Sequence, residues 1–158
     1  TPADSKADQA EIYREVRRAR IFQRPLTLMA IDVEEKSAQI ALDRIVQEVQ
    51  LAMIKQYVLS DVSQALCSEL DDYNIVAQEN SRFLVVLPEV SEEQVQAVAR
   101  RLRKATSEKV GVSLRIGAAS LPADAVTFDG LVRKAVGGMQ LDKAPILATR
   151  EATAEPTL

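Results

Sequence analysis

The sequence predicts one domain of the α/β class in its α+β form, with a mostly antiparallel central sheet of about five strands flanked by helices. Three observations lead to this prediction. Short apolar runs alternate with longer amphipathic segments along the chain. Two of the apolar runs, 75–77 and 83–87, stand close enough together to form a hairpin. Finally, 158 residues of which 47% are hydrophobic are enough to fill a single core.

The first two elements are a helix and a buried strand. The helix is predicted over 8–22 and ends before Pro25. Its apolar residues recur near helical spacing and are Ile12, Val16, Ala19 and Ile21. The apolar run 26–31 then predicts a buried strand, which stops at an acidic cluster that begins with Asp32.

The longest predicted helix covers 35–70, a span without glycine or proline. Apolar residues follow an i, i+3/i+4 stripe along it, which predicts that it packs on the core. A straight helix of this length would measure about 50 Å, which is long for so small a domain. The stripe also shifts phase near Gln56 and Tyr57. We therefore expect a break or bend there, or a helix that protrudes and offers a surface to a partner helix.

A hairpin and a capped helix come next. The polar stretch 78–82 separates the two hairpin strands. Ser91 is expected to cap the helix that follows. This helix is predicted to finish in four basic residues, Arg100, Arg101, Arg103 and Lys104. Favourable interaction with the helix dipole is the preferred explanation for these charges, ahead of an anion-binding or partner patch.

The last elements are two strands and a short helix. Alternating apolar and polar residues predict a strand over 110–119. A short helix begins at Phe128 and is expected to end at the glycine pair 137–138. Ile146 and Leu147 predict a final edge strand.

Composition excludes several classes of function. The net charge is −3 and the charged residues are interspersed, so nucleic acid is not an expected partner. No apolar run approaches the length of about 18 residues that spans a bilayer, which argues against direct membrane insertion and favours a cytoplasmic location. There is no histidine and only one cysteine, Cys67, so a Ser-His-Asp triad, a Cys-His pair or an ordinary zinc site cannot form. Nothing near Cys67 would activate its thiol, and we assign it no role.

Five segments of the chain, taken in order, resemble the GGDEF family of diguanylate cyclases. Residues 25–34, PLTLMAIDVE, are similar to the family segment PLxLLxxDID. Residues 75–88, IVAQENSRFLVVLP, are similar to LVARYGGDEFxVLLP, which holds the family signature. Residues 95–104, 114–119 and 131–143 are similar to AxxxAxRLR, SIGVA and LLxxADxALYxAK. The ordered set carries more weight than any one motif, and it implies a GGDEF, nucleotidyl-cyclase-like fold.

The resemblance also implies that the signature loop has degenerated. Glu79 and Asn80 stand where the family has two glycines that let the backbone approach a nucleotide. Ser81 and Arg82 stand where the family has a magnesium-binding acid and a glutamate. Phe83 matches the last residue of the signature. Asn80 and Ser81 still suit a turn, so we expect the hairpin to survive.

Two other positions match ligand contacts of the family. Asp32 matches the first aspartate of the metal-binding DID segment, and Lys143 matches a lysine that contacts phosphates. One carboxylate holds Mg²⁺ poorly, so a strand-end acid exposed to water is the preferred interpretation of Asp32 over a remnant metal ligand. The family segment that recognises guanine, at 36–43, and its inhibitory RxxD site, at 69–74, have both lost their pattern.

The resemblance therefore predicts a catalytically inactive GGDEF-like domain that acts as a regulatory or protein-interaction module in bacterial signalling and needs no cofactor. Its partner would be another protein, the neighbouring domains of a larger chain, or a second copy in a homodimer. The alternative is a receptor that binds GTP or cyclic di-GMP without turnover through Asp32, Lys143 and the loop 79–82, with Mg²⁺ bound only beside the nucleotide. A residual enzyme is the least supported hypothesis. The domain is expected over 1–150, with a disordered tail at 151–158.

Overall fold

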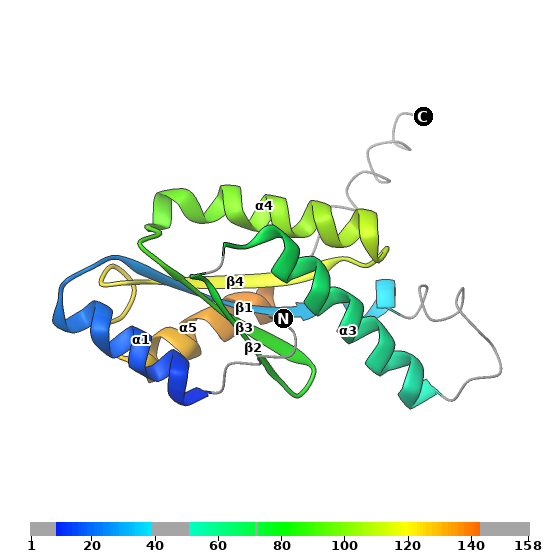
Figure 1. Ribbon diagram of the computed structural model, residues 1–158, viewed down its shortest axis with the longest axis horizontal. Coiled ribbons are helices and arrows are strands. Elements are labelled where there is room, and N and C mark those ends of the chain that lie inside the picture. Colours follow the sequence, from blue (N-terminus) through cyan, green and yellow to red (C-terminus); the bar gives the residue numbers. More distant parts are fainter. Residues whose placement is uncertain (1–8, 39–50, 72, 143–158) are drawn as a thin grey trace.

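The computed structural model of the protein describes residues 9–38, 51–71 and 73–142. The helices in this part of the chain are α1 (Gln9–Ile21), α3 (Leu51–Glu69), α4 (Glu92–Lys109) and α5 (Phe128–Leu141), and a further helical turn covers 35–38. The strands are β1 (Leu26–Val33), β2 (Ile75–Glu79), β3 (Arg82–Pro88) and β4 (Leu114–Leu121). They form one antiparallel sheet in the order β2-β3-β1-β4, with helices around it (Figure 1).

The predicted fold class is confirmed. Four strands occur in the described residues, against about five predicted from the element pattern. The fifth strand, predicted at 146–147, lies outside the described residues, as does the predicted tail at 151–158. None of the helices in the described segments has the length and hydropathy needed to cross a bilayer.

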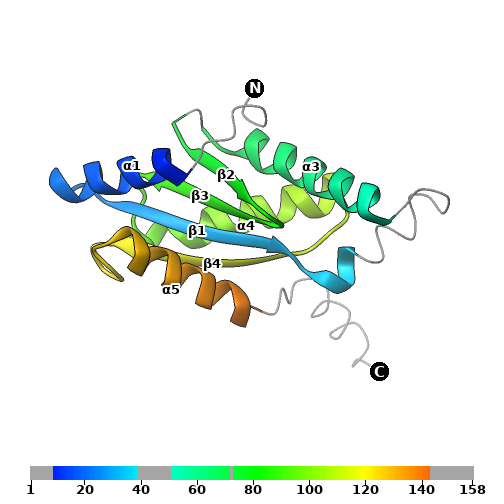
Figure 2. The same ribbon diagram turned by 90° about the horizontal axis from the view of Figure 1, so that it is seen from below.

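Both faces of the sheet are covered at β1, and the burial pattern follows from this. All residues from Leu26 to Ile31 are buried. Because side chains alternate between the two faces of a strand, Met29 and Ile31 belong to the core under α3 and α4, whereas Leu28 and Ala30 belong to the core under α1 and α5. Figure 2 shows α1 and α5 in front of the sheet and α4 behind it. With both faces covered, polar groups are left to gather at the strand ends.

The helix α5 lies directly against β4 because Gly117 has no side chain. A Cβ atom at Gly117 would lie 2.0 Å from the carbonyl oxygen of Ala135. The helix runs on through Gly137 and Gly138, so the prediction that this pair ends it is wrong. A Cβ atom on Gly138 would lie 3.4 Å from Cα of Gly117. The small residue at 138 therefore serves close packing against the strand, and not helix termination.

Two helices differ from their predicted extent. α3 runs through Gln56 and Tyr57 without the expected break. Both residues are exposed, whereas Val58, Leu59, Val62, Ala65 and Leu66 form the buried face of the helix, so the phase shift lies next to the start of this face. α4 continues beyond the basic cluster to Lys109, because Ala105 and Thr106 prolong its buried stripe. As predicted, Ser91 is its N-cap residue.

The strands differ from prediction mainly at their ends. β4 begins at Leu114, four residues later than predicted. In the hairpin, Glu79 and Arg82 still pair across the two strands, so the polar stretch is mostly strand and only Asn80 and Ser81 form the tip. Asn80 has a left-handed φ of 59°, a conformation that asparagine tolerates better than most residues. The survival of the hairpin is confirmed, although its loop is shorter than predicted.

Candidate functional site

Three charged residues line up across the sheet where β1 ends. Asp32 on β1 is in register with Arg82 on β3 and with Arg115 on β4. Directly opposed residues of antiparallel strands project from the same face, with Cβ atoms about 5 Å apart. Alternation along β1 puts these residues on the face that also carries Ala30 and Leu28. We call Asp32, Arg82 and Arg115 the charged row.

Arg115 forms a two-point ion pair with Asp32. Its Nε donates to Oδ1 at 2.8 Å and its Nη2 donates to Oδ2 at 2.5 Å. The side chain of Asp32 is 18% exposed and that of Arg115 is 32% exposed, so solvent screens the pair only in part. The hydrogen bond to Asp32 raises the pKa of Arg115, and the charges of Asp142 and Glu34 add to the effect. Arg115 is therefore a permanent cation that occupies both oxygens of Asp32.

A second ion pair connects the two strands of the hairpin. Arg82 donates from Nε and Nη2 to Oε1 of Glu79, at 3.2 and 2.8 Å. The two residues face each other on β2 and β3, next to the turn, and both side chains are partly buried. The charges of the signature loop are thus directed toward each other.

Asp142, just after α5, ties the edge of the sheet to α4. Its Oδ2 accepts hydrogen bonds from the backbone N–H of Ile116 at 2.8 Å and from Nη2 of Arg103 at 2.5 Å. The interpretation of Arg103 as a charge at a helix end is wrong, because α4 extends past it and its side chain is mostly buried beside Asp142. This contact fixes the end of α5 next to the charged row.

The donor set does not fit a magnesium ion held for phosphoryl transfer. Mg²⁺ takes hard oxygen ligands, usually carboxylates together with phosphates and water. Across the described segments, no three side chains of the types His, Cys, Asp and Glu are placed to hold a metal ion. Both oxygens of Asp32 face Arg115, and the hairpin tip carries Asn80 and Ser81. A cation at this place would have to displace a guanidinium group.

The structure brings some predicted site residues together and separates others. Asp32 and Arg82 share the charged row, while Phe83 is fully buried in the core under α3 and α4. Lys143 lies outside the described residues. The interpretation of Asp32 as an acid exposed to water is wrong, because Arg115 covers it. The alternation over 110–119 puts Arg115 on the polar side of its strand, but no sequence pattern identifies its partner.

Known structures share this arrangement of strands and helices, although no family model and no curated protein sequence matches the chain. The GGDEF domain of PA1120 (TpbB or YfiN) from Pseudomonas aeruginosa is 24% identical, with a TM-score of 0.69 over 85% of this chain and 80% of that one. The GGDEF domain of DgcB from Caulobacter crescentus, in complex with c-di-GMP, is 14% identical, with a TM-score of 0.64 over 84% and 80%. The diguanylate cyclase SiaD from Pseudomonas aeruginosa, in complex with its activator SiaC, is 18% identical, with a TM-score of 0.68 over 89% and 56%. The chain therefore has the fold of the GGDEF domains of diguanylate cyclases.

Proposed function

We propose that this domain is catalytically inactive and acts as a regulatory or protein-interaction module in bacterial cyclic di-GMP signalling. The observation that carries the proposal is the ion pair between Asp32 and Arg115. Asp32 is the acid that the resemblance assigns to metal binding, and a cation on the neighbouring strand already holds both of its oxygens.

Electrostatics support the absence of catalysis. Transfer of a nucleotidyl group depends on metal ions that bridge and neutralise the phosphates. A divalent ion beside Asp32 would lie next to the guanidinium of Arg115, and like charges repel strongly where solvent is scarce. At the hairpin, Glu79 and Asn80 place side chains and one negative charge where the resemblance expects bare backbone.

A receptor without turnover is the second candidate, and one observation favours it. Arg82 and Arg115 stand in the same row, and paired guanidinium groups are suited to bind phosphate. Each of them already donates to a carboxylate of this chain, however. A phosphate would gain these contacts only by displacing Glu79 or Asp32, so we prefer the inactive module.

Two proteins of the same fold bear on the choice between these candidates. SiaD forms a complex with an activator protein, which is in keeping with a protein partner for this fold. A domain of DgcB forms a complex with c-di-GMP, which is in keeping with the receptor alternative. We expect this domain to be located in the cytoplasm.

The proposal is tested by incubating the purified protein with GTP and Mg²⁺ and separating the nucleotides by chromatography, with an active diguanylate cyclase in parallel. We expect no cyclic di-GMP, either from the natural protein or from Arg115→Ala, in which Asp32 is released. Isothermal titration with GTP and with cyclic di-GMP should give no heat of binding. Heat without product would favour the receptor, and cyclic di-GMP formed by the natural protein would refute the proposal.

A further inference from the structure

α5 has a weak point at Gly137, close to its C-terminal end. Glycine weakens a helix because it loses more backbone freedom on folding than any other residue. The neighbouring Gly138 is explained by packing, since its missing side chain lets the helix lie against Gly117. A Cβ atom on Gly137, by contrast, would meet nothing within 4 Å. Gly137 therefore weakens α5 without any gain in packing.

The two parts of α5 on either side of Gly137 are held to the sheet unequally. The part before it carries Leu131 and Ala135, which are both fully buried. The part after it buries one apolar side chain, Met139, whereas Leu141 is 80% exposed. Regions with few buried apolar contacts open at a lower free energy than the rest of a fold. The last turn of α5 is thus the part of this helix that opens most readily.

Asp142 holds this last turn to two other elements. Its Oδ2 accepts hydrogen bonds from the backbone N–H of Ile116 on β4, at 2.8 Å, and from Nη2 of Arg103 on α4, at 2.5 Å. β4 is an edge strand, and α4 and α5 cover opposite faces of the sheet, so these contacts pass around its edge (Figure 2). We call the two contacts of Asp142 the latch. Both end on one oxygen atom, so a single displacement breaks them together.

The latch is only partly satisfied. The side chains of Arg103 and Asp142 are 19% and 18% exposed, so both charges are largely removed from water. Nε of Arg103 is buried and has no hydrogen-bond partner among the described residues. A buried donor without an acceptor costs free energy. The latch is therefore weaker than a pair such as Asp32 with Arg115, in which both Nε and Nη2 donate.

We infer that residues 138–142 form a segment that opens as a unit around Gly137 when the latch is released, while the rest of α5 stays on the sheet. Opening frees the N–H of Ile116 at the edge of β4 and exposes Met139. Ile116 directly follows Arg115, so the change takes place beside the charged row. The domain thus has a part that changes state while the rest of the fold is kept, which suits a regulatory module.

Native-state hydrogen exchange measured by NMR tests this segment. In the natural protein, the amides of 139–141 and of Ile116 should show equal protection, because one opening exposes them all. The amides of 131–135 should be protected about tenfold more strongly or better. Asp142→Ala should speed the exchange of 139–141 by about tenfold or more. Gly137→Ala should slow it about threefold, since alanine favours a helix.

Asp124→Ala is the matched control. Oδ2 of Asp124 accepts a hydrogen bond from the N–H of Ser120 at 2.8 Å, which is a contact of the same kind near the other end of β4. Its loss should speed exchange at Ser120 and leave 139–141 unchanged. Asp142→Ala leaves the guanidinium of Arg103 buried without a carboxylate. The double variant with Arg103→Met removes both charges, so it covers the case in which the single variant does not fold, and it should show the same local increase.

Oxidation by hydrogen peroxide gives a second readout. Met139 and Met29 are both buried, but only Met139 lies in the segment. Mass spectrometry should find Met139 converted to its sulfoxide about tenfold faster than Met29 or more, because only its opening is local.

Three results would overturn the inference: equal protection along the whole of α5, unchanged exchange of 139–141 in both latch variants, or equal oxidation of Met139 and Met29. The segment would open whether or not the domain turns over GTP. A positive turnover assay would therefore refute the proposed function and leave the latched segment standing.

Discussion

Arg115 on β4 and Asp32 on β1 stand in register and share two hydrogen bonds, at 2.8 and 2.5 Å. This pair fixes the ends of two neighbouring strands that otherwise carry apolar side chains toward α1 and α5. A carboxylate at this depth needs a partner, and a ligand could supply one only when bound. Here the partner belongs to the chain, so the end of the sheet is ordered without a ligand.

A double-mutant cycle with Asp32→Ala and Arg115→Ala should reveal this coupling. We expect an interaction free energy of about 1 kcal/mol from urea unfolding, because the pair is two-pronged and mostly shielded from water. The same cycle with Arg24→Ala and Glu89→Ala should show weaker coupling, since both side chains of that pair are largely exposed. Equal interaction free energies in the two cycles would show that burial does not strengthen the pair between Asp32 and Arg115.

A methyl group at Gly117 should destabilise the domain strongly. The added Cβ atom would lie 2.0 Å from a carbonyl oxygen of α5, so helix and strand would have to separate. Gly117→Ala should lower the free energy of unfolding by about 3 kcal/mol or more. Gly137→Ala is the control, because its Cβ atom would have nothing within 4 Å and alanine favours a helix. That variant should gain about 0.5–1 kcal/mol, and similar losses in both would argue against the close approach.

The sequence pattern predicted most of the fold because the burial of one face of a helix or strand makes apolar residues recur at regular spacing. The alternation in β4 and the helical stripe of α1 correspond to the faces that the two cores cover. The glycine pair of α5 was misjudged for a physical reason. A glycine can end a helix or let it approach a neighbour, and only the position of Gly117 on β4 decides between the two.

The candidate site was less predictable, because ion pairs across a sheet depend on register. The sequence places Asp32 at a strand end and Arg115 on the polar side of another strand, 83 positions away. Nothing local shows that these two positions face each other. The contacts of Asp142 with Arg103 and Ile116 could not be predicted for the same reason, since they exist only once α4, α5 and β4 are assembled.

Cys67 should react slowly with alkylating reagents in the folded protein. Burial raises the pKa of its thiol, and a hydrogen bond with Ser63 offsets this only in part. Since the thiolate is the reactive species, less of it is present at neutral pH than in the unfolded chain. Labelling by iodoacetamide, followed by mass spectrometry, should be about tenfold slower in buffer than in urea, and it should accelerate as the pH rises. Equal rates in the two conditions would show that the thiol is not shielded.

The ion pair between Arg24, just before β1, and Glu89, just after β3, should make the stability of the domain depend on pH. The hydrogen bond from Arg24 lowers the pKa of Glu89 below its ordinary value, so the carboxylate is preferred in the folded state. The stabilisation is therefore fully present above the pKa of the unfolded chain and is lost as the pH falls through the lowered pKa of the folded state. Carbon-detected NMR titration of the Glu89 carboxyl group should show this low pKa.

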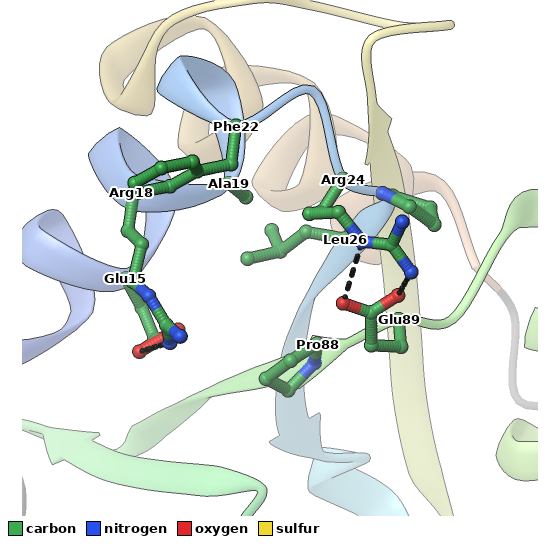
Figure 3. Close-up of a pocket in the computed structure, with 9 residues that line it drawn as sticks. Glu15, Arg18, Ala19, Phe22, Arg24, Leu26, Pro88 and Glu89 are labelled. Atoms are coloured by element: carbon green, nitrogen blue, oxygen red, sulfur yellow. Dashed lines mark hydrogen bonds and ion pairs between the residues drawn. The ribbon is translucent and has the colours of Figure 1, made fainter.

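Two variants decide whether Arg24 is the cause. Arg24→Ala should return the pKa of Glu89 toward its ordinary value, because the donor of both hydrogen bonds is gone. Arg101→Ala, an arginine of α4 that donates to the backbone of Glu69, should leave it unchanged. If Glu89 keeps its low pKa without Arg24, another cation lowers that pKa. Arg18 on α1 also contributes to the shift, so it is the residue to replace next (Figure 3).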